Sequence, residues 1–174
     1  MLISVGYAAM STTLTINGTA NITATSWNVY FTNVQTTSGS VVATTEPTTN
    51  GVTTTELTWE VTMDTPGQFY EFNVDVQNDG TINAMIGSLS NSTLTVEQAK
   101  YLNYIVTYSD GASIEQYDKL DAGETVTLKI RLEYRTDIDP EDLPTTANQI
   151  TFVYTSDYVQ ADNNAKDRNV NQAP

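Results

Sequence analysis

The sequence predicts an all-β protein: a single jelly-roll or Ig-like β-sandwich with one short helix near residues 95–101. Three observations lead to this prediction. Apolar and polar side chains alternate in several runs, as in strands that bury one face. Turn pairs such as Pro-Gly and Asp-Gly separate these runs, and Thr is abundant while Lys is scarce. A chain of 174 residues is also long enough to bury a core as one domain.

Strands are expected from the first part of the chain, between residues 12 and 34. Apolar positions alternate over 14–16 and 22–24, and again over 27–31 after a change of phase near Thr25. A change of phase in a period of two indicates a bulge or a bend, because one extra residue moves the side chains to the other face.

The next segment predicts an edge hairpin and then a half-buried strand. Residues 41–55 are rich in Thr, and Asn50-Gly51 is a typical hairpin tip. Leu, Trp, Val and Met alternate with polar residues over 57–63, which predicts a strand. A tight turn over 64–67 follows, because Pro fixes φ at one central position and Gly accepts a positive φ at the next.

Two more strands and the helix are expected between residues 70 and 101. Alternation over 70–76 predicts a strand that ends at an Asn-Asp-Gly turn, and another strand is expected over 82–86. Thr95 and Gln98 have the spacing of a capping box, in which each side chain binds the other residue's backbone N–H. The helix is therefore expected to begin after Thr95.

Three further strands complete the predicted sandwich. They are expected over 102–108, 126–134 and 149–158, with turns at Asp110-Gly111 and Ala122-Gly123 between them. Within these strands Tyr104, Tyr108, Tyr134 and Tyr154 share the phase of aliphatic residues, so we expect them in the core rather than on a sugar-binding platform.

The chain is thus expected to have three parts: an apolar N-terminal strand over 1–16, a sandwich over 17–158, and a polar C-terminal tail over 159–174. The leading strand has three interpretations: a strand donated to a neighbouring subunit, the first strand of its own domain, or the end of a signal peptide. Its apolar run is too short to span a membrane. The residues expected to enter a neighbouring subunit are Leu2, Ile3, Val5, Tyr7, Met10, Leu14 and Ile16.

Charge and composition exclude several classes of function. Seven Lys and Arg against 21 Asp and Glu give a formal charge of −14, which repels nucleic acid and anionic membranes. The chain has no His and no Cys, so catalytic triads with His, thiolate nucleophiles and His or Cys metal ligands cannot form. We therefore expect neither enzyme activity nor a cofactor.

One acidic cluster is a weak candidate for calcium. Asp137, Asp139, Glu141 and Asp142 lie close together in the sequence, and Ca²⁺ prefers carboxylate oxygens. Their spacing does not match an EF-hand loop, and Pro140 is typical of a turn. A solvated acidic loop is therefore the favoured interpretation, with calcium as the alternative.

Two segments carry a family resemblance. Residues 65–89, TPGQFYEFNVDVQNDGTINAMIGSL, resemble the turn, strand, N-x-G-T/S turn and strand of the TasA and camelysin group, secreted proteins of Gram-positive bacteria. Residues 120–124, Leu-Asp-Ala-Gly-Glu, are similar to the turn before a late strand in that group. The resemblance implies a jelly roll that assembles into extracellular biofilm fibres, in which each N-terminal strand completes the sheet of the next subunit.

The sequence therefore predicts a secreted or cell-surface structural protein. Its expected partners are copies of itself, assembled head to tail into a pilus or a fibre of the biofilm matrix. A monomeric adhesion or carbohydrate-binding module is the alternative, because exposed Tyr and Trp rings can stack on sugars.

Overall fold

The computed structural model describes residues 24–49, 55–91, 94–144 and 154–168, and this part of the chain forms an all-β sandwich with one α-helix. The strands are β1 (Val29–Gly39), β2 (Ala43–Thr45), β3 (Glu60–Val61), β4 (Phe69–Asn78), β5 (Ala84–Asn91), β6 (Leu102–Tyr108), β7 (Lys119–Leu120), β8 (Thr125–Tyr134) and β9 (Tyr154–Gln160). The helix α1 covers Val96–Tyr101, and a 3-10 turn, η1, covers Pro140–Asp142. The predicted fold class is confirmed as an all-β sandwich, whereas the jelly-roll topology stays a prediction.

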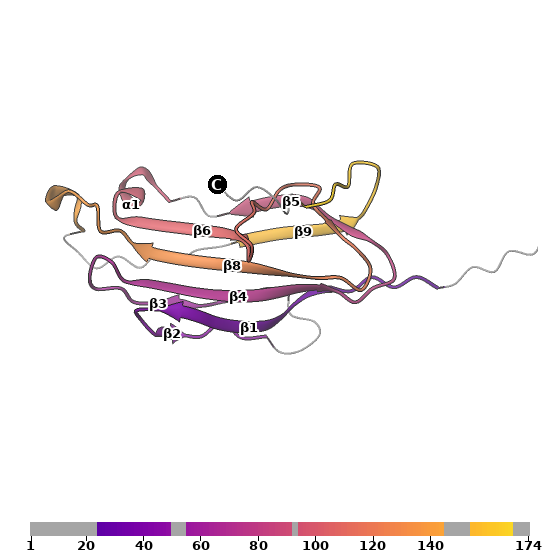
Figure 1. Cartoon of the computed structure of the whole chain (residues 1–174), viewed down its shortest axis with the longest axis horizontal. Coiled ribbons are helices and arrows are strands. Elements are labelled where there is room, and N and C mark those ends of the chain that lie inside the picture. Colours follow the sequence, from indigo (N-terminus) through magenta and orange to yellow (C-terminus); the bar gives the residue numbers. More distant parts are fainter. Residues whose placement is uncertain (1–23, 50–54, 92–93, 145–153, 169–174) are drawn as a thin grey trace, which may run out of the picture.

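The first layer is a four-stranded antiparallel sheet in the order β1-β4-β8-β6, which runs along the long axis of the molecule in Figure 1. The second layer comprises the three-stranded sheet β7-β5-β9 and the pair β2-β3. The main core lies between the layers, where buried side chains of β4 and β8 pack with those of β5 and β7. A smaller cluster contains Leu102, Leu132 and Tyr134. Figure 1 shows β5 and β9 toward one end of the sandwich and β2 and β3 toward the other.

The two central strands confirm the predicted alternation most clearly. Every second residue of β4 is buried from Tyr70 to Asn78, and β8 alternates in the same way from Val126 to Tyr134. The two strands pair without a register shift, with Phe72 opposite Ile130. Trp59 packs on this layer, with its ring 5.6 Å from Phe72 in an edge-to-face arrangement. A period of two in the sequence was therefore enough to identify the central core residues.

The segment 57–63 keeps its predicted faces, but only a short part of it pairs as a strand. Leu57, Trp59, Val61 and Met63 pack against the core, as expected. The backbone ladder covers only Glu60–Val61, because β2 is three residues long and pairs with a register shift. The hairpin tip expected at Asn50-Gly51 lies outside the described residues.

The helix and its neighbouring turns form as the sequence predicts. The backbone N–H of Gln98 donates to Thr95 Oγ1 at 3.2 Å, and that of Thr95 donates to Gln98 Oε1 at 2.9 Å, which completes the capping box. Strand β6 follows at the next residue after the helix. Gly67 takes a φ of 90°, as expected for the turn before β4. None of the helices in the described ranges is long and apolar enough to cross a membrane.

The first and last strands along the chain differ from the prediction. The strands expected over 14–16 and 22–24 lie mostly or wholly outside the described residues, and Trp27 precedes β1 and is 46% exposed. The register shifts occur inside β1 rather than near Thr25. The last strand begins at Tyr154 in the described part and extends two residues beyond the expected end at Tyr158. Beyond it, the described part of the polar tail runs back along β7.

Candidate functional site

The turn after β4 holds the chain just before it enters β1. The backbone N–H of Asp79 donates to the carbonyl oxygen of Asn28 at 2.8 Å, and that of Thr81 donates to the carbonyl oxygen of Ser26 at 3.0 Å. The N–H of Ser26 in turn donates to Thr81 Oγ1 at 2.9 Å. A Cβ atom at Gly80 would lie 2.7 Å from the carbonyl oxygen of Ser26, so this close approach requires glycine.

Asn78 joins this turn to the turn before β8. Its fully buried side chain donates to the carbonyl oxygens of Ile82 at 2.9 Å and Leu120 at 3.2 Å, and it accepts from the N–H of Gly80 at 3.1 Å. Its backbone N–H donates to the carbonyl oxygen of Glu124 at 2.9 Å. The two segments that carry the family resemblance therefore meet at one buried residue. We call residues 26–28, 78–81 and 120–124 the N-terminal anchor.

The N-terminal anchor fixes where the preceding chain leaves the sandwich. Residues 24–28 emerge at the end opposite α1, along the long axis of the molecule (Figure 1). Because three backbone or side-chain hydrogen bonds hold residues 26–28, the direction of exit is set by the fold. A segment that precedes residue 24 therefore starts from a fixed point at one end of the subunit.

Three of the sheet edges carry features that hinder the addition of another strand. Strand β1 has two register shifts, and Asn33 lies there with a positive φ of 50°. The tail covers β7, because the backbone of Lys166 bonds to Lys119 and Tyr117 at 2.9 Å each. Strand β9 contains Asp157, and its pairing with β5 has a register shift between Ile86 and Ser88. Bulges, charges and covering segments are the usual protections of an edge strand.

In the part of the chain that the structure describes, strand β6 shows none of these features. Its seven residues, LNYIVTY, include no charge, no Pro and no Gly, and they pair with β8 without a register shift. On its other side, β6 pairs with no strand among the residues that the structure describes. Ile105 lies on the outer face and is 38% exposed. A regular, uncharged edge is the kind of surface that accepts a further strand.

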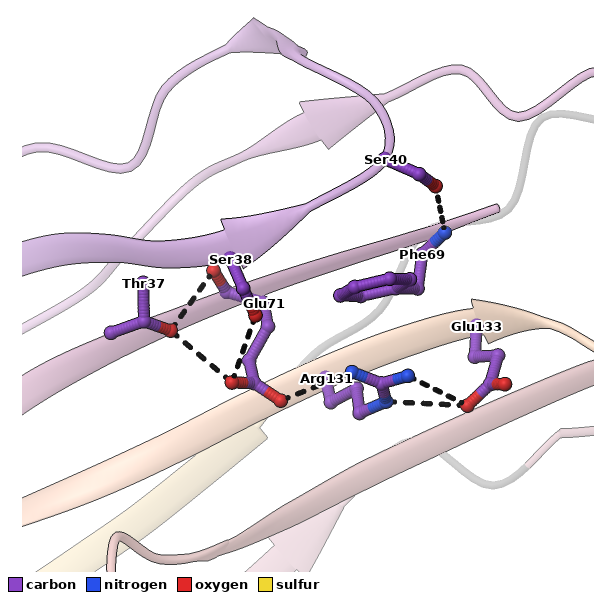
Figure 2. Close-up of polar contacts among 7 residues, drawn as sticks. All are labelled: Thr37, Ser38, Ser40, Phe69, Glu71, Arg131 and Glu133. Atoms are coloured by element: carbon purple, nitrogen blue, oxygen red, sulfur yellow. Dashed lines mark hydrogen bonds and ion pairs between the residues drawn. The ribbon is translucent and has the colours of Figure 1, made fainter. Parts of the chain in front are cut away.

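Next to β6, paired charges cover the outer face of the same sheet. Figure 2 shows Arg131 between Glu71 and Glu133, with guanidinium to carboxylate distances of 3.3 and 3.1 Å. The guanidinium carbon lies 4.0 Å from the centre of the Phe69 ring, and Glu71 also accepts from Ser38 Oγ at 3.3 Å. These contacts tie β1, β4 and β8 together on the outer face of the sheet.

The residues proposed from the sequence fall into two groups. The donor-strand residues, Leu2 to Ile16, lie outside the described residues, so their role stays a prediction. In the acidic cluster, Asp137 pairs with Arg135 at 2.6 Å, and this hydrogen bond lowers the pKa of Asp137. Asp142 pairs with Lys100 at 2.8 Å. No group of three or more Asp or Glu side chains in the described ranges is placed to hold a metal ion.

The tyrosines expected in the core lie there. Tyr108 and Tyr134 are buried, while Tyr104 and Tyr154 are partly buried and pack against the core. Burial raises the pKa of Tyr104 and of Tyr154 to about 12, because the phenolate would lose its hydration. The exposed aromatic side chains in the described ranges are Trp27 and Tyr117, which leaves few rings for a sugar platform.

Sequence reasoning missed Asn78 and the β6 edge. The signal for Asn78 was present, because Asn followed by Gly two residues later is typical of a side chain that caps its own turn. The signal for β6 was a seven-residue run without charge in a strongly acidic chain. Only the sheet order shows that this run forms an edge.

Comparisons with known proteins do not identify the chain: no family model, no curated protein and no solved structure matches it.

Proposed function

We propose that the chain is the structural subunit of an extracellular filament, such as a pilus or a fibre of the biofilm matrix. In this proposal, residues 1–16 of one subunit add as a strand to the β6 edge of the next subunit. The contact is heterologous, so repetition produces an open polymer of identical subunits. The observation that carries the proposal is the regular, uncharged β6 edge, which pairs with no second strand among the described residues.

The position of the N-terminal anchor supports a head-to-tail arrangement. The preceding chain starts at one end of the long axis, and β6 runs along that axis (Figure 1). Apolar side chains recur from Leu2 to Ile16 in the leading segment, and a strand added to β6 would bring such side chains to the boundary of the core. The main-chain hydrogen bonds would supply the affinity, and the alternate side chains would set the register.

Removal of residues 1–11 is expected to abolish polymer formation while the sandwich stays folded. The deletion removes most of the donated strand but leaves every described contact of the core and of the N-terminal anchor. Negative-stain electron microscopy of the full chain and the truncated chain measures fibre formation, and circular dichroism checks the β content. Fibres of unchanged length and number from the truncated chain would refute strand donation.

A charge on the edge strand is expected to block the acceptor side. Ile105→Lys places an ammonium group on the outer face of β6, where Ile105 is 38% exposed, so the change is tolerated by the fold but disfavours an added strand. Fibre yield by sedimentation is expected to fall at least about tenfold.

The matched control is Val42→Lys, at an apolar residue that is more exposed than Ile105 and lies outside the β6 edge. If both variants form fibres like the full chain, β6 is not the acceptor. The Ile105→Lys chain still carries the strand to be donated, and the chain that lacks residues 1–11 still carries the β6 acceptor edge. Mixing the two chains therefore tests donation and acceptance separately.

The alternative, a monomeric adhesion or carbohydrate-binding module, predicts different behaviour. Such a module would remain monomeric by light scattering at concentrations at which a filament subunit polymerises. Its glycan contacts would fall on Trp27 or Tyr117, the exposed aromatic side chains of the described ranges. Strong binding on a glycan array that is lost in Trp27→Ala or Tyr117→Ala would favour this alternative.

A further inference from the structure

The C-terminal tail brings an amine next to a buried carboxyl group. Asp118 precedes β7 and is only 4% exposed, although it is an acidic residue in a chain with a formal charge of −14. Lys166 forms a parallel β-bridge with Asp118, and its backbone bonds to the residues on either side of that aspartate. The Lys166 Nζ atom lies 4.0 Å from Asp118 Oδ1. The backbone therefore holds the two side chains together.

The two carboxyl oxygens of Asp118 have different surroundings. Oδ2 accepts a hydrogen bond from the Tyr108 hydroxyl at 2.9 Å and another from the backbone N–H of Glu115 at 2.8 Å. Oδ1 lies toward Lys166, 4.0 Å from its Nζ atom. Two donors aimed at one oxygen of a carboxyl group stabilise negative charge on that oxygen, as an oxyanion hole does during acyl transfer.

The amine of Lys166 has a proton acceptor in contact with it. Lys166 Nζ donates to the carboxylate of Glu115, and this hydrogen bond raises the pKa of Lys166. The lysine therefore rests as an ammonium ion, and Glu115 is the group placed to take a proton from it. Lys166 is partly exposed and Asp118 is buried, so the pair lies at the boundary of the core.

We propose that Lys166 and Asp118 become joined by an intramolecular amide bond, with Glu115 as the proton carrier and with Tyr108 and the Glu115 N–H as the oxyanion donors. The geometry that points to this is a buried carboxyl group with two donors on one oxygen and an amine 4.0 Å from the other. The proposal does not depend on filament formation.

The reaction balances without an oxidant or a cofactor. Lys166 gives one proton to Glu115, which passes it to Oδ1 of Asp118, and the free amine then attacks the carbon of the neutral carboxyl group, which forms the C–N bond. Oδ2 carries the negative charge of the tetrahedral intermediate toward its two donors. Glu115 carries a second proton from the nitrogen to Oδ1, the C–Oδ1 bond breaks, and one water molecule leaves. An ammonium and a carboxylate thus become a neutral amide and water, while Glu115 returns to its carboxylate form.

The surrounding contacts hold the tail in place for this step. Lys119 pairs with Asp167 at 2.9 Å, and Arg168 pairs with Glu124 at 3.2 Å. The guanidinium of Arg168 also lies 4.9 Å from the centre of the Tyr108 ring. Fixing the two reacting groups on adjacent backbone segments raises their effective concentration, which lowers the barrier to an intramolecular acyl transfer.

Intact-mass spectrometry of the purified, folded chain tests the proposal. The expected mass is lower than that of the sequence by one water molecule. After digestion with trypsin, peptide 101–119 is expected to be joined to peptide 136–168, because modified Lys166 is not cleaved. A full sequence mass together with free peptides from both regions, after prolonged incubation at alkaline pH, would overturn the proposal.

Two variants assign the roles. Lys166→Arg keeps the positive charge but cannot form the amide under these conditions, so its mass is expected to equal that of its sequence. Glu115→Gln keeps the backbone N–H on Oδ2 but removes the proton acceptor, so the cross-link is expected to form on the order of a hundredfold more slowly. A loss of one water in Lys166→Arg would place the modification elsewhere. A cross-link that forms in Glu115→Gln as fast as in the parent chain would remove Glu115 from the mechanism.

Discussion

Alanine in place of Phe72 is expected to lower the free energy of unfolding by about 3–5 kcal/mol, the usual range for a buried aromatic side chain in a close-packed core. Phe72 lies at the centre of the sandwich, opposite Ile130 and with almost none of its surface exposed. Its ring also contacts Trp59 at 5.6 Å and Tyr70 at 5.8 Å between centroids. The surrounding strands cannot close the resulting cavity without breaking their register.

Phe69→Ala is the matched control on the same strand. Phe69 points to the outer face, where its main contact is the guanidinium of Arg131 at 4.0 Å, so its removal is expected to cost only about 1 kcal/mol. Denaturant unfolding followed by tryptophan fluorescence measures both values. Equal losses for the two variants would contradict the assignment of faces in β4.

Asn78→Ala is expected to lower the free energy of unfolding by about 3 kcal/mol, because it leaves several buried backbone groups without partners. The carbonyl oxygens of Ile82 and Leu120 and the N–H of Gly80 all lose a hydrogen bond. Water cannot easily replace the side chain, since Asn78 is fully buried. The effect should therefore exceed that of an ordinary surface hydrogen bond.

Asn103→Ala serves as the control, because Asn103 is an exposed residue of β6. Its free energy of unfolding is expected to change by less than about 0.5 kcal/mol. Hydrogen exchange adds a local measurement: in Asn78→Ala, the amides of Asp79 and Thr81 are expected to exchange faster than those of the central strands. Unchanged protection at these amides would show that Asn78 does not hold the turn.

The sequence alone predicted the parts of the fold in which local pattern and tertiary packing agree. The period of two in β4 and β8 follows from burial of one face, and the Thr95 capping box is a local set of contacts. The segment 57–63 shows the limit of that reasoning. Its side chains alternate as expected, but the length of a ladder depends on the partner strand, and β2 offers only three residues.

The candidate sites depend on contacts between distant segments, which no local pattern contains. Strand β6 has a clear strand sequence, yet its position at an edge follows from the order of the sheet. Asp118 and Lys166 are 48 residues apart in the sequence, and the parallel bridge brings them together in the fold. The polar composition of the C-terminal tail gave no sign of its contacts, because hydropathy does not register ion pairs such as Arg168 with Glu124.

The N-terminal anchor also imposes an order of events on a newly made chain. Residues 26–28 bond to the turn 78–81, and Asn78 in that turn bonds to the carbonyl oxygens of Leu120 and Glu124. Because the ribosome makes the amino end first, the complete N-terminal anchor can form only after Glu124 has been made. The strand donation proposed above would therefore have to wait until late in synthesis.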